Sequence, residues 1–368
     1  MTRPGVTRVV VRAPNWLGDI VMAFPAIAAI RAAHPDAHLA VAAPAPFADV
    51  CAAVPGVDAV VPLRGSGIRA IGAHAEALRA GGFDLAILFT NSFASALAAS
   101  RAGIAERWGY RRDWRGRLLT RAVPVRSRSR TTPESTVQSS RSTPESSGST
   151  PESSGRHHSA YYLRLVAALG LPPVEAGPGS VAPLVPSAAA AERACALLAE
   201  AGLDHGARLV GFAPGAAYGS AKRWPPERVA GAIAGVTRHG ARAVLVGAAG
   251  DREIARAIQS ALDPAVRASV VDLVGRTDVA TLMATLARCA VVVANDSGAM
   301  HVASAVGRPV VAIFGPTDER ATAPMGPHTL VRHDVFCRPC LLRACPIDHR
   351  CLRRIDAADV IEAVARHL

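Results

Sequence analysis

The residues best suited to chemistry lie in a Gly-rich loop that follows a predicted strand at Leu209–Ala213. The loop reads PGAAYGSAKRWP over residues 214–225 and leads into a predicted helix. Its backbone N–H groups can approach an anion closely, and its side chains add a hydroxyl and two cations, which together suit a diphosphate. It is not a P-loop, because the lysine is followed by arginine instead of Ser or Thr. The residues expected to bind the diphosphate are Gly215, Ser220, Lys222 and Arg223.

Lys222 also stands out by composition. It is the only lysine among 41 basic residues, and the others are all arginine. A lysine retained against that background indicates a position where a compact ammonium works and a wide guanidinium does not. Chance survival of one lysine is the alternative, but its place in the phosphate-like loop favours a functional role.

Two further strand-to-helix loops in the second half carry polar residues. One contains Asp251 and Glu253, whose carboxylates suit either ribose hydroxyls or simply the positive end of a helix dipole. The other reads NDSGAMH at 295–301 and opens a helix whose first N–H groups suit a second phosphate oxygen. A lone histidine such as the one in this loop is more often structural than a ligand. The residues of this loop expected to contact a ligand are Asp296, Ser297, Gly298 and His301.

Asp19 is the candidate for proton transfer in the first half. It ends the segment RAPNWLGD at 12–19, directly after the first predicted strand, and lies at the start of a helix. A carboxylate there serves either as a plain helix cap or as a general base. Gly18 beside it permits a close approach to the backbone. The loop lacks G-x-G-x-x-G, so it is not a dinucleotide fingerprint.

Strands and helices alternate along the chain in a way that would bring these loops together. Short apolar runs are separated by segments of helical period, among them the expected helices Asp19–His34 and Phe47–Val54. This alternation predicts parallel sheets with helices on both faces and ligands at the carboxyl ends of the strands. We therefore expect an α/β protein of two Rossmann-like, doubly wound domains facing a cleft. The expected units are a first domain at 1–180, a second at 181–355 and a C-terminal helix at 356–368.

One segment, residues 126–156, does not fit this alternation. The heptad STPESSG occurs there twice in tandem, and only Val137 is apolar enough to bury. We expect a disordered insertion.

The composition places the rest of the chain among soluble globular proteins. The sequence has 368 residues, of which 50% are hydrophobic and 19% are charged. No apolar run reaches the roughly 18–20 residues that a transmembrane helix needs, and the N-terminus shows no secretory signal. The expected location is therefore cytoplasmic.

The net charge of +12 indicates an anionic partner. Residues 101–130 contain ten arginines against Glu106 and Asp113, with Trp108, Tyr110 and Trp114 between them. Taken alone, this stretch is most simply a solvated basic face. No nucleic-acid motif accompanies it, so nucleic acid is not an expected partner.

Four of the seven cysteines fall within fifteen residues. C-x2-C followed by further cysteines favours a structural metal site, although the later gaps match no standard zinc module. A cluster of reduced thiols is the alternative. The candidate metal ligands are Cys337, Cys340, Cys345 and Cys351.

Four stretches together resemble the lipopolysaccharide heptosyltransferases of glycosyltransferase family 9, and in particular their heptosyltransferase II group. They are APNWLGD at 13–19, TNSFASAL at 90–97, the loop PGAAYGSAKRWP, and NDSGAMHVASAVGRPVVAIFGPT at 295–317. The resemblance covers nearly the whole chain outside 126–156. Ala216 and Ala217 stand where heptosyltransferase I has hydroxyl residues, which favours the second group.

The resemblance implies a GT-B fold and an inverting transfer that needs no cofactor for catalysis. Heptose would pass from ADP-L-glycero-D-manno-heptose to the first heptose of the lipopolysaccharide inner core, with Asp19 as general base and Lys222 at the donor diphosphate. The three loops of the second half would bind the donor. The residues implied to bind the acceptor are Asn15, Trp16, Gly18, Asn91, Arg111 and Arg112.

The implied partners are ADP-heptose and a phosphorylated lipid A-core acceptor. The basic stretch at 101–130 would then hold the acceptor phosphates and the anionic inner leaflet, which places the protein peripherally on the cytoplasmic face of the inner membrane. Two alternatives stay open. One is a related family 9 transferase, heptosyltransferase I-like or with another sugar acceptor. The other is a non-catalytic nucleotide-sugar-binding protein, which would keep Lys222 but not need Asp19.

Overall fold

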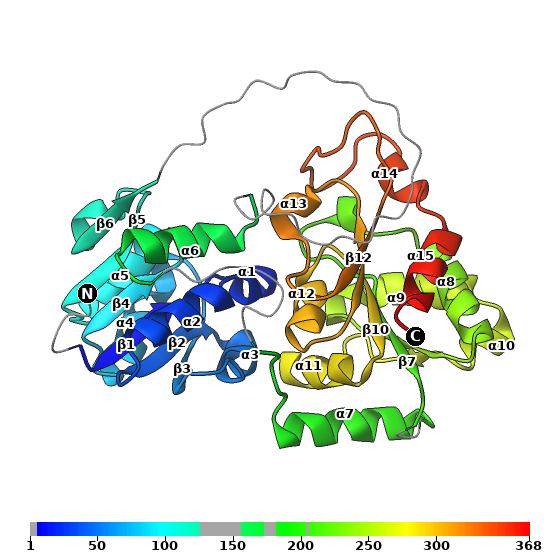
Figure 1. Ribbon diagram of the computed structural model, residues 1–368, viewed down its shortest axis with the longest axis horizontal. Coiled ribbons are helices and arrows are strands. Elements are labelled where there is room, and N and C mark those ends of the chain that lie inside the picture. The colour runs from blue at the N-terminus through cyan, green and yellow to red at the C-terminus, as the bar shows by residue number, and fades with distance from the viewer. Residues whose placement is uncertain (1–5, 126–155, 173–181, 204–205) are drawn as a thin grey trace.

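Two α/β domains lie side by side (Figure 1). The computed structural model describes residues 6–125, 156–172, 182–203 and 206–368. Each domain contains a six-stranded sheet in which neighbouring strands are parallel. The expected α/β class with two doubly wound, Rossmann-like domains is therefore confirmed.

The first sheet has the strand order β3-β2-β1-β4-β5-β6. Its central strands are buried on both faces, which explains why they read as unbroken apolar runs. The strands are β1 (Arg8–Arg12), β2 (His38–Pro44), β3 (Ala59–Leu63), β4 (Leu85–Leu88), β5 (Glu106–Arg111) and β6 (Arg121–Pro124). The helices are α1 (Leu17–Met22), α2 (Phe24–Ala33), α3 (Ala48–Ala52), α4 (Ile71–Ala80), α5 (Phe93–Arg101) and α6 (Ser159–Ala168), and the last of these packs on α2.

The second sheet repeats this winding with the order β12-β11-β10-β7-β8-β9. Its strands are β7 (Leu209–Ala213), β8 (Arg242–Leu245), β9 (Val271–Asp272), β10 (Val291–Asn295), β11 (Val310–Phe314) and β12 (His328–Arg332). The helices are α7 (Ala188–Glu200), α8 (Pro226–Arg238), α9 (Arg252–Ala261), α10 (Pro264–Arg267), α11 (Val279–Arg288), α12 (Gly298–Ala305), α13 (Glu319–Thr322), α14 (Arg350–Arg353) and α15 (Ala357–Ala365). The last helix packs on α8, so the chain ends against the second domain.

Two expected helices are shorter than the sequence pattern indicated. The single helix expected over 19–34 is broken at Ala23 into α1 and α2, and Pro25 lies in the first turn of α2. Proline has no N–H for the helical ladder and clashes with the carbonyl four residues earlier, so one helix cannot run through this point. The helix expected over 47–54 is a 3₁₀ turn at Ala45–Phe47 followed by the short α3.

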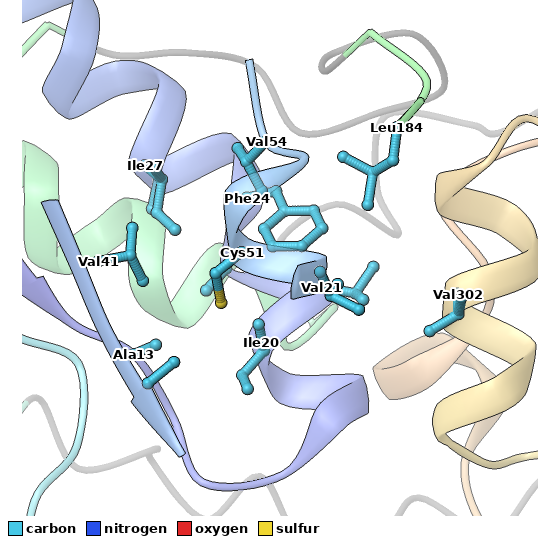
Figure 2. Packing of buried hydrophobic residues seen from close by; sticks show 14 of the residues in the cluster. Ala13, Ile20, Val21, Phe24, Ile27, Val41, Cys51, Val54, Leu184 and Val302 are labelled. Carbon is cyan, nitrogen blue, oxygen red and sulfur yellow. The ribbon is translucent and has the colours of Figure 1, made fainter. Parts of the chain in front are cut away.

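An apolar contact joins the domains. Helix α1 packs on α12, and α3 packs on α11. Figure 2 shows Val21 and Phe24 of the first domain in the same cluster as Leu184 and Val302 of the second. Because α1 and α12 each begin at a loop with candidate site residues, this contact brings the loops of the two domains together.

Three further expectations concern membrane-spanning helices, the insertion at 126–156 and the boundary between the domains. Among the described residues, no helix combines the length and hydropathy needed to cross a membrane. The expected insertion at 126–156 lies outside the described residues except for its last position. The boundary expected between 180 and 181 also lies outside them, so the domain limits stay a prediction.

Candidate functional site

The candidate residues gather where the strand order reverses in each sheet. In the first sheet the reversal lies between β1 and β4, and in the second it lies between β7 and β10. Ligands of doubly wound sheets bind at this point, outside the carboxyl ends of the strands. Asp19 follows β1, Asn91 follows β4, Lys222 follows β7 and Asp296 follows β10. All four switch-point strands therefore lead into a loop with a candidate residue.

Lys222 and Asp296 form a buried ion pair. The Lys222 Nζ lies 2.7 Å from Asp296 Oδ2, and the two side chains are only 13% and 5% exposed. The ammonium also lies 4.9 Å from the ring centroid of Tyr218, as in a cation–π contact. Both charged residues were expected in the donor site, and the fold brings them into direct contact, one from the loop after β7 and the other from the loop after β10.

Asn295 fixes the loop that carries Lys222. Its side-chain amide donates to the Pro214 carbonyl at 2.7 Å, and its Oδ1 accepts from the Trp224 backbone N–H at 3.3 Å. One buried side chain of β10 thus holds both ends of the loop that follows β7. Asn295 starts the NDSG segment but was not among the residues expected in the site.

Asp19 faces the same ion pair from the first domain. It lies in the first turn of α1 and is 33% exposed. Burial raises the pKa of the Asp19 carboxyl, while His158 and Lys222 act to lower it and Asp296 acts to raise it. A carboxyl whose pKa is raised toward neutrality is a stronger base than an ordinary aspartate, and this suits it to accept a proton.

His301 is the contact between the two loops. A β-carbon on Gly18 would lie 2.8 Å from the His301 Cδ2, so the imidazole can approach this closely only because residue 18 is glycine. Burial lowers the pKa of His301 to about 4, which leaves the imidazole neutral at physiological pH. Gly298 has a similar role, because a β-carbon there would lie 3.1 Å from the Leu17 Cβ.

Several buried polar atoms in the donor loops have no partner. Within the described residues, Arg223 Nε, Ser297 Oγ and His301 Nδ1 are buried and make no hydrogen bond. Buried polar groups are almost always paired, so such atoms need an explanation. Their position around Lys222 is what a site for a polar ligand requires.

The other expected donor residues differ in how they are held. Asp251 accepts a hydrogen bond from the Ala248 N–H at 3.0 Å, and Arg223 Nη2 lies 3.7 Å from its Oδ1. A β-carbon on Gly215 would lie 2.3 Å from its carboxylate oxygen, so Gly215 is needed for this packing. Ser220 and Glu253 are exposed, at the start of a 3₁₀ turn (Ser220–Lys222) and in the first turn of α9.

The expected acceptor residues lie at or after the carboxyl ends of β1, β4 and β5. Asn15 Oδ1 accepts from the Arg12 guanidinium at 2.7 Å, and Trp16, which precedes α1, is 57% exposed. Asn91 donates to the Tyr161 hydroxyl at 2.8 Å. Arg111 and Arg112 are exposed at the end of β5.

The basic stretch is less uniform than the sequence indicated. Arg115 is completely buried, where its guanidinium donates to the carbonyls of Tyr110 and Thr90, and burial lowers its pKa to about 10. Arg107 also donates to backbone carbonyls. These two arginines therefore support the fold.

The predicted metal site is not supported. Cys351 is buried, and its pKa is raised by burial and by the nearby Cys337, Cys340 and Cys345. The thiols are free. Yet no group of three or more His, Cys, Asp or Glu side chains in the described ranges is arranged to hold a metal ion. The segment between the cysteines contacts the Lys222 loop.

That segment has a role the sequence analysis missed. The carbonyl of Arg343 accepts from the Ala221 N–H at 3.0 Å, and the Tyr218 hydroxyl donates to the Leu341 carbonyl at 3.0 Å. A β-carbon on Gly219 would lie 2.2 Å from the Arg343 oxygen. The cysteine-containing segment therefore packs directly on the loop that presents Lys222. No local sequence signal links these two segments, which are more than a hundred residues apart.

Comparison with known proteins identifies the family. The model of glycosyltransferase family 9 (heptosyltransferase) matches residues 179–350. Lipopolysaccharide heptosyltransferase 2 of Salmonella typhimurium is 31% identical over 326 residues, which cover 86% of this chain and 85% of that protein. The chain belongs to glycosyltransferase family 9.

Other family 9 proteins agree in sequence and fold. Lipooligosaccharide heptosyltransferase 2 of Haemophilus influenzae is 28% identical over 316 residues, covering 85% of this chain and 84% of that protein. The structure of E. coli ADP-heptose lps heptosyltransferase II aligns over 98% of both chains with a TM-score of 0.74 at 27% identity. This family 9 heptosyltransferase is therefore an enzyme of lipopolysaccharide core synthesis with the GT-B fold, as the resemblance implied.

Proposed function

We propose that this heptosyltransferase transfers L-glycero-D-manno-heptose from ADP-heptose to the first heptose of the lipopolysaccharide inner core, with inversion. The observation that carries the proposal is that the Lys222–Asp296 ion pair of the second domain lies near the Asp19 carboxyl of the first. The Lys222–Asp296 pair lies at the switch point of the second sheet, and Asp19 at that of the first is close enough for both to influence its pKa.

The proposed chemistry uses these groups in one displacement. Asp19 takes the proton of the acceptor hydroxyl as its oxygen forms a bond to the anomeric carbon of heptose. The bond from that carbon to the diphosphate oxygen breaks, and ADP leaves with the electron pair. Lys222 stabilises the negative charge that develops on the diphosphate, which is where a positioned cation lowers the barrier most.

The second domain supplies the proposed donor site. The unpaired Arg223 Nε, Ser297 Oγ and His301 Nδ1 are available to diphosphate or sugar oxygens. Asp251 and Glu253 are proposed to lie near the nucleoside, and Gly215 and Gly298 keep the loops close-packed. Catalysis is proposed to require no cofactor.

The first domain is proposed to bind the phosphorylated lipid A-core acceptor. Asn15, Trp16 and Asn91 lie on its switch-point loops, and Arg111 and Arg112 are exposed nearby in the chain. Trp114, which follows them, is 96% exposed. An exposed aromatic ring beside arginines suits an anionic bilayer surface, so we propose a peripheral location on the cytoplasmic face of the inner membrane.

Two experiments test this function. Transfer from ADP-heptose, compared with other nucleotide sugars, should be measured on lipid A-core acceptors with and without the first heptose. The proposal requires ADP-heptose to be preferred and the heptose-bearing acceptor to be used. Preference for the acceptor without heptose would support a heptosyltransferase I-like enzyme instead.

Replacing the general base provides the second test. Asp19→Asn keeps the side-chain size but removes the base, and this typically lowers turnover about 10²–10⁴-fold. Binding of ADP, measured by calorimetry, should change little because the donor loops lie on the other domain. Normal turnover in this variant would refute the assignment of Asp19 as the general base.

A further inference from the structure

A pair of histidines directly before α6 contacts both domains at the proposed site. His157 and His158 follow the segment 126–155 and precede Ser159, the first residue of α6. The His158 backbone N–H donates to the carbonyl of Ala321 in α13 at 2.8 Å. The His157 Nε2 lies 2.9 Å from the carbonyl of Ala323, at the end of the same helix. The start of α6 is thus attached to the second domain, while α6 itself packs on α2 in the first.

The side chain of His158 points toward Asp19. The His158 Nε2 lies 3.8 Å from Asp19 Oδ1, and the imidazole is 42% exposed. The same nitrogen lies 3.3 Å from the Tyr162 hydroxyl, one helical turn further on. When Nε2 carries a proton, the Asp19 carboxylate and the Tyr162 hydroxyl oxygen are both in position to face it.

Two aromatic rings fix the orientation of this imidazole. It stacks on Tyr161 with the ring centroids 5.7 Å apart and an interplanar angle of 15°. It meets Tyr162 edge-on at 5.3 Å and 83°. Tyr162 is almost completely buried, so the ring rests against a rigid part of α6. The backbone bond to α13 fixes the position of His158, and the two tyrosines hold its imidazole beside Asp19.

We propose that His158 is a positioning residue that keeps the Asp19 carboxylate charged and oriented for proton removal. Because His158 is attached to α13 of the second domain, this positioning depends on the observed arrangement of the two domains. The inference rests on the proposed role of Asp19 as general base. It assigns no contact between His158 and substrate.

The surroundings of Asp19 explain why such a residue matters. The charged and titratable groups that influence the Asp19 carboxyl are His158, Lys222 and Asp296, and Tyr162 is near enough for Asp19 to act on it. Burial and Asp296 favour the protonated carboxyl, while the two cations favour the charged form. Lys222 is already paired with Asp296. His158 is therefore the other group that favours the charged form of the Asp19 carboxyl.

The test is the pH dependence of kcat/KM in His158→Gln. On the acid limb the wild-type imidazolium lowers the pKa of Asp19, so the uncharged variant should lose activity at a higher pH. A nearby opposite charge lowers a carboxyl pKa by about 1–3 units, and partial exposure reduces this to a shift of about 0.5–1 pH unit. At a fixed pH on that limb the loss is about three- to tenfold, and it should shrink toward alkaline pH, where Asp19 is deprotonated in both proteins.

Matched variants separate this role from a structural one. His157→Ala removes the contact with Ala323 but keeps the His158 imidazole and the bond from its backbone N–H to Ala321, so its acid limb should move less than that of His158→Gln. Heat unfolding should show that His158→Gln folds, and His158→Asn provides a second uncharged replacement. An unmoved acid limb in a folded His158 variant, or an equal loss at every pH, would overturn the proposal.

The double variant separates this inference from the proposed function. In an Asp19→Asn background, His158→Gln should change the remaining activity less than about twofold, because a residue that acts through Asp19 has nothing left to act on. Normal turnover in Asp19→Asn alone refutes the general base. A slow Asp19→Asn together with a wild-type acid limb in His158→Gln refutes only the positioning role.

Discussion

Replacing Lys222 should reduce stability and turnover by two separate routes. Lys222→Ala leaves the Asp296 carboxylate, which is 5% exposed, without the ammonium 2.7 Å away. Removing one partner of a buried ion pair typically destabilises a protein by about 3–5 kcal/mol. The same variant removes the cation proposed to face the departing diphosphate, and the loss of one such group lowers turnover about 10²–10³-fold.

Lys222→Arg tests whether the site needs a compact ammonium. The Nζ lies 4.9 Å from the Tyr218 ring centroid, and the Tyr218 hydroxyl is held by the Leu341 carbonyl. A guanidinium should keep the charge and recover most of the stability, yet its wider head has to displace these neighbours. Since a misplacement of about 1 Å can lower a rate about 10²-fold, we expect turnover at least about tenfold below the wild type.

Heat unfolding, steady-state kinetics with ADP-heptose and calorimetry of ADP binding measure these effects. Arg276→Ala is the matched control, because Arg276 lies 2.7 Å from Glu200 in an exposed ion pair. Its loss should change stability by less than about 1 kcal/mol. A wild-type melting temperature in Lys222→Ala would refute the buried pair. Full activity in Lys222→Arg would mean that the site does not require the compact ammonium group of lysine.

Three further predictions follow from the same geometry. The general base must be deprotonated, so the raised pKa of Asp19 should place the midpoint of the acid limb of kcat/KM above the ordinary value of 3.8; a midpoint at or below it would contradict the assignment. Gly219→Ala puts a β-carbon 2.2 Å from the Arg343 carbonyl oxygen, so it should lower the free energy of unfolding by about 1–3 kcal/mol and lower turnover. Gly72→Ala in α4 is the control: its β-carbon meets nothing within 4 Å, so it should stabilise the protein by up to about 1 kcal/mol. Elemental analysis should find well under one metal ion per chain, and thiol titration after denaturation should find all seven cysteines free; stoichiometric metal would contradict the observed arrangement.

The candidate site could be predicted from sequence where its chemistry is local. The loop around Lys222, the NDSG segment and Asp19 are each short runs in which composition and position after a strand carry the signal. Local patterns also predicted the alternation of strands and helices, because the period of apolar residues differs between them. The break between α1 and α2 was visible too, since Pro25 cannot continue a helix, although the sequence analysis did not use it.

The parts that were missed depend on residues far apart in the chain. His158 lies beside Asp19, 139 positions earlier in the chain, only because α6 returns to pack on α2. Arg343 reaches the loop of Gly219 in the same way. Arg115 looked like a surface cation in a basic stretch, yet the fold buries it among carbonyls. The cysteines were close in sequence, which favoured a metal site, but no group of three or more metal-ligating side chains in the described part of the chain is arranged to hold a metal ion.

The sequence by itself determined the fold class, the strands that end in functional loops and the residue types those loops present. These properties depend on local periodicity and on backbone chemistry, which act over a few neighbouring residues. Only the tertiary structure decided which of these groups face one another. The pairing of Lys222 with Asp296, the neutral state of His301 and the raised pKa of Asp19 all depend on burial and distance. Electrostatic interactions between side chains depend on their separation in space and on the surrounding dielectric. These pairings and pKa shifts therefore cannot be derived from the order of residues along the chain alone.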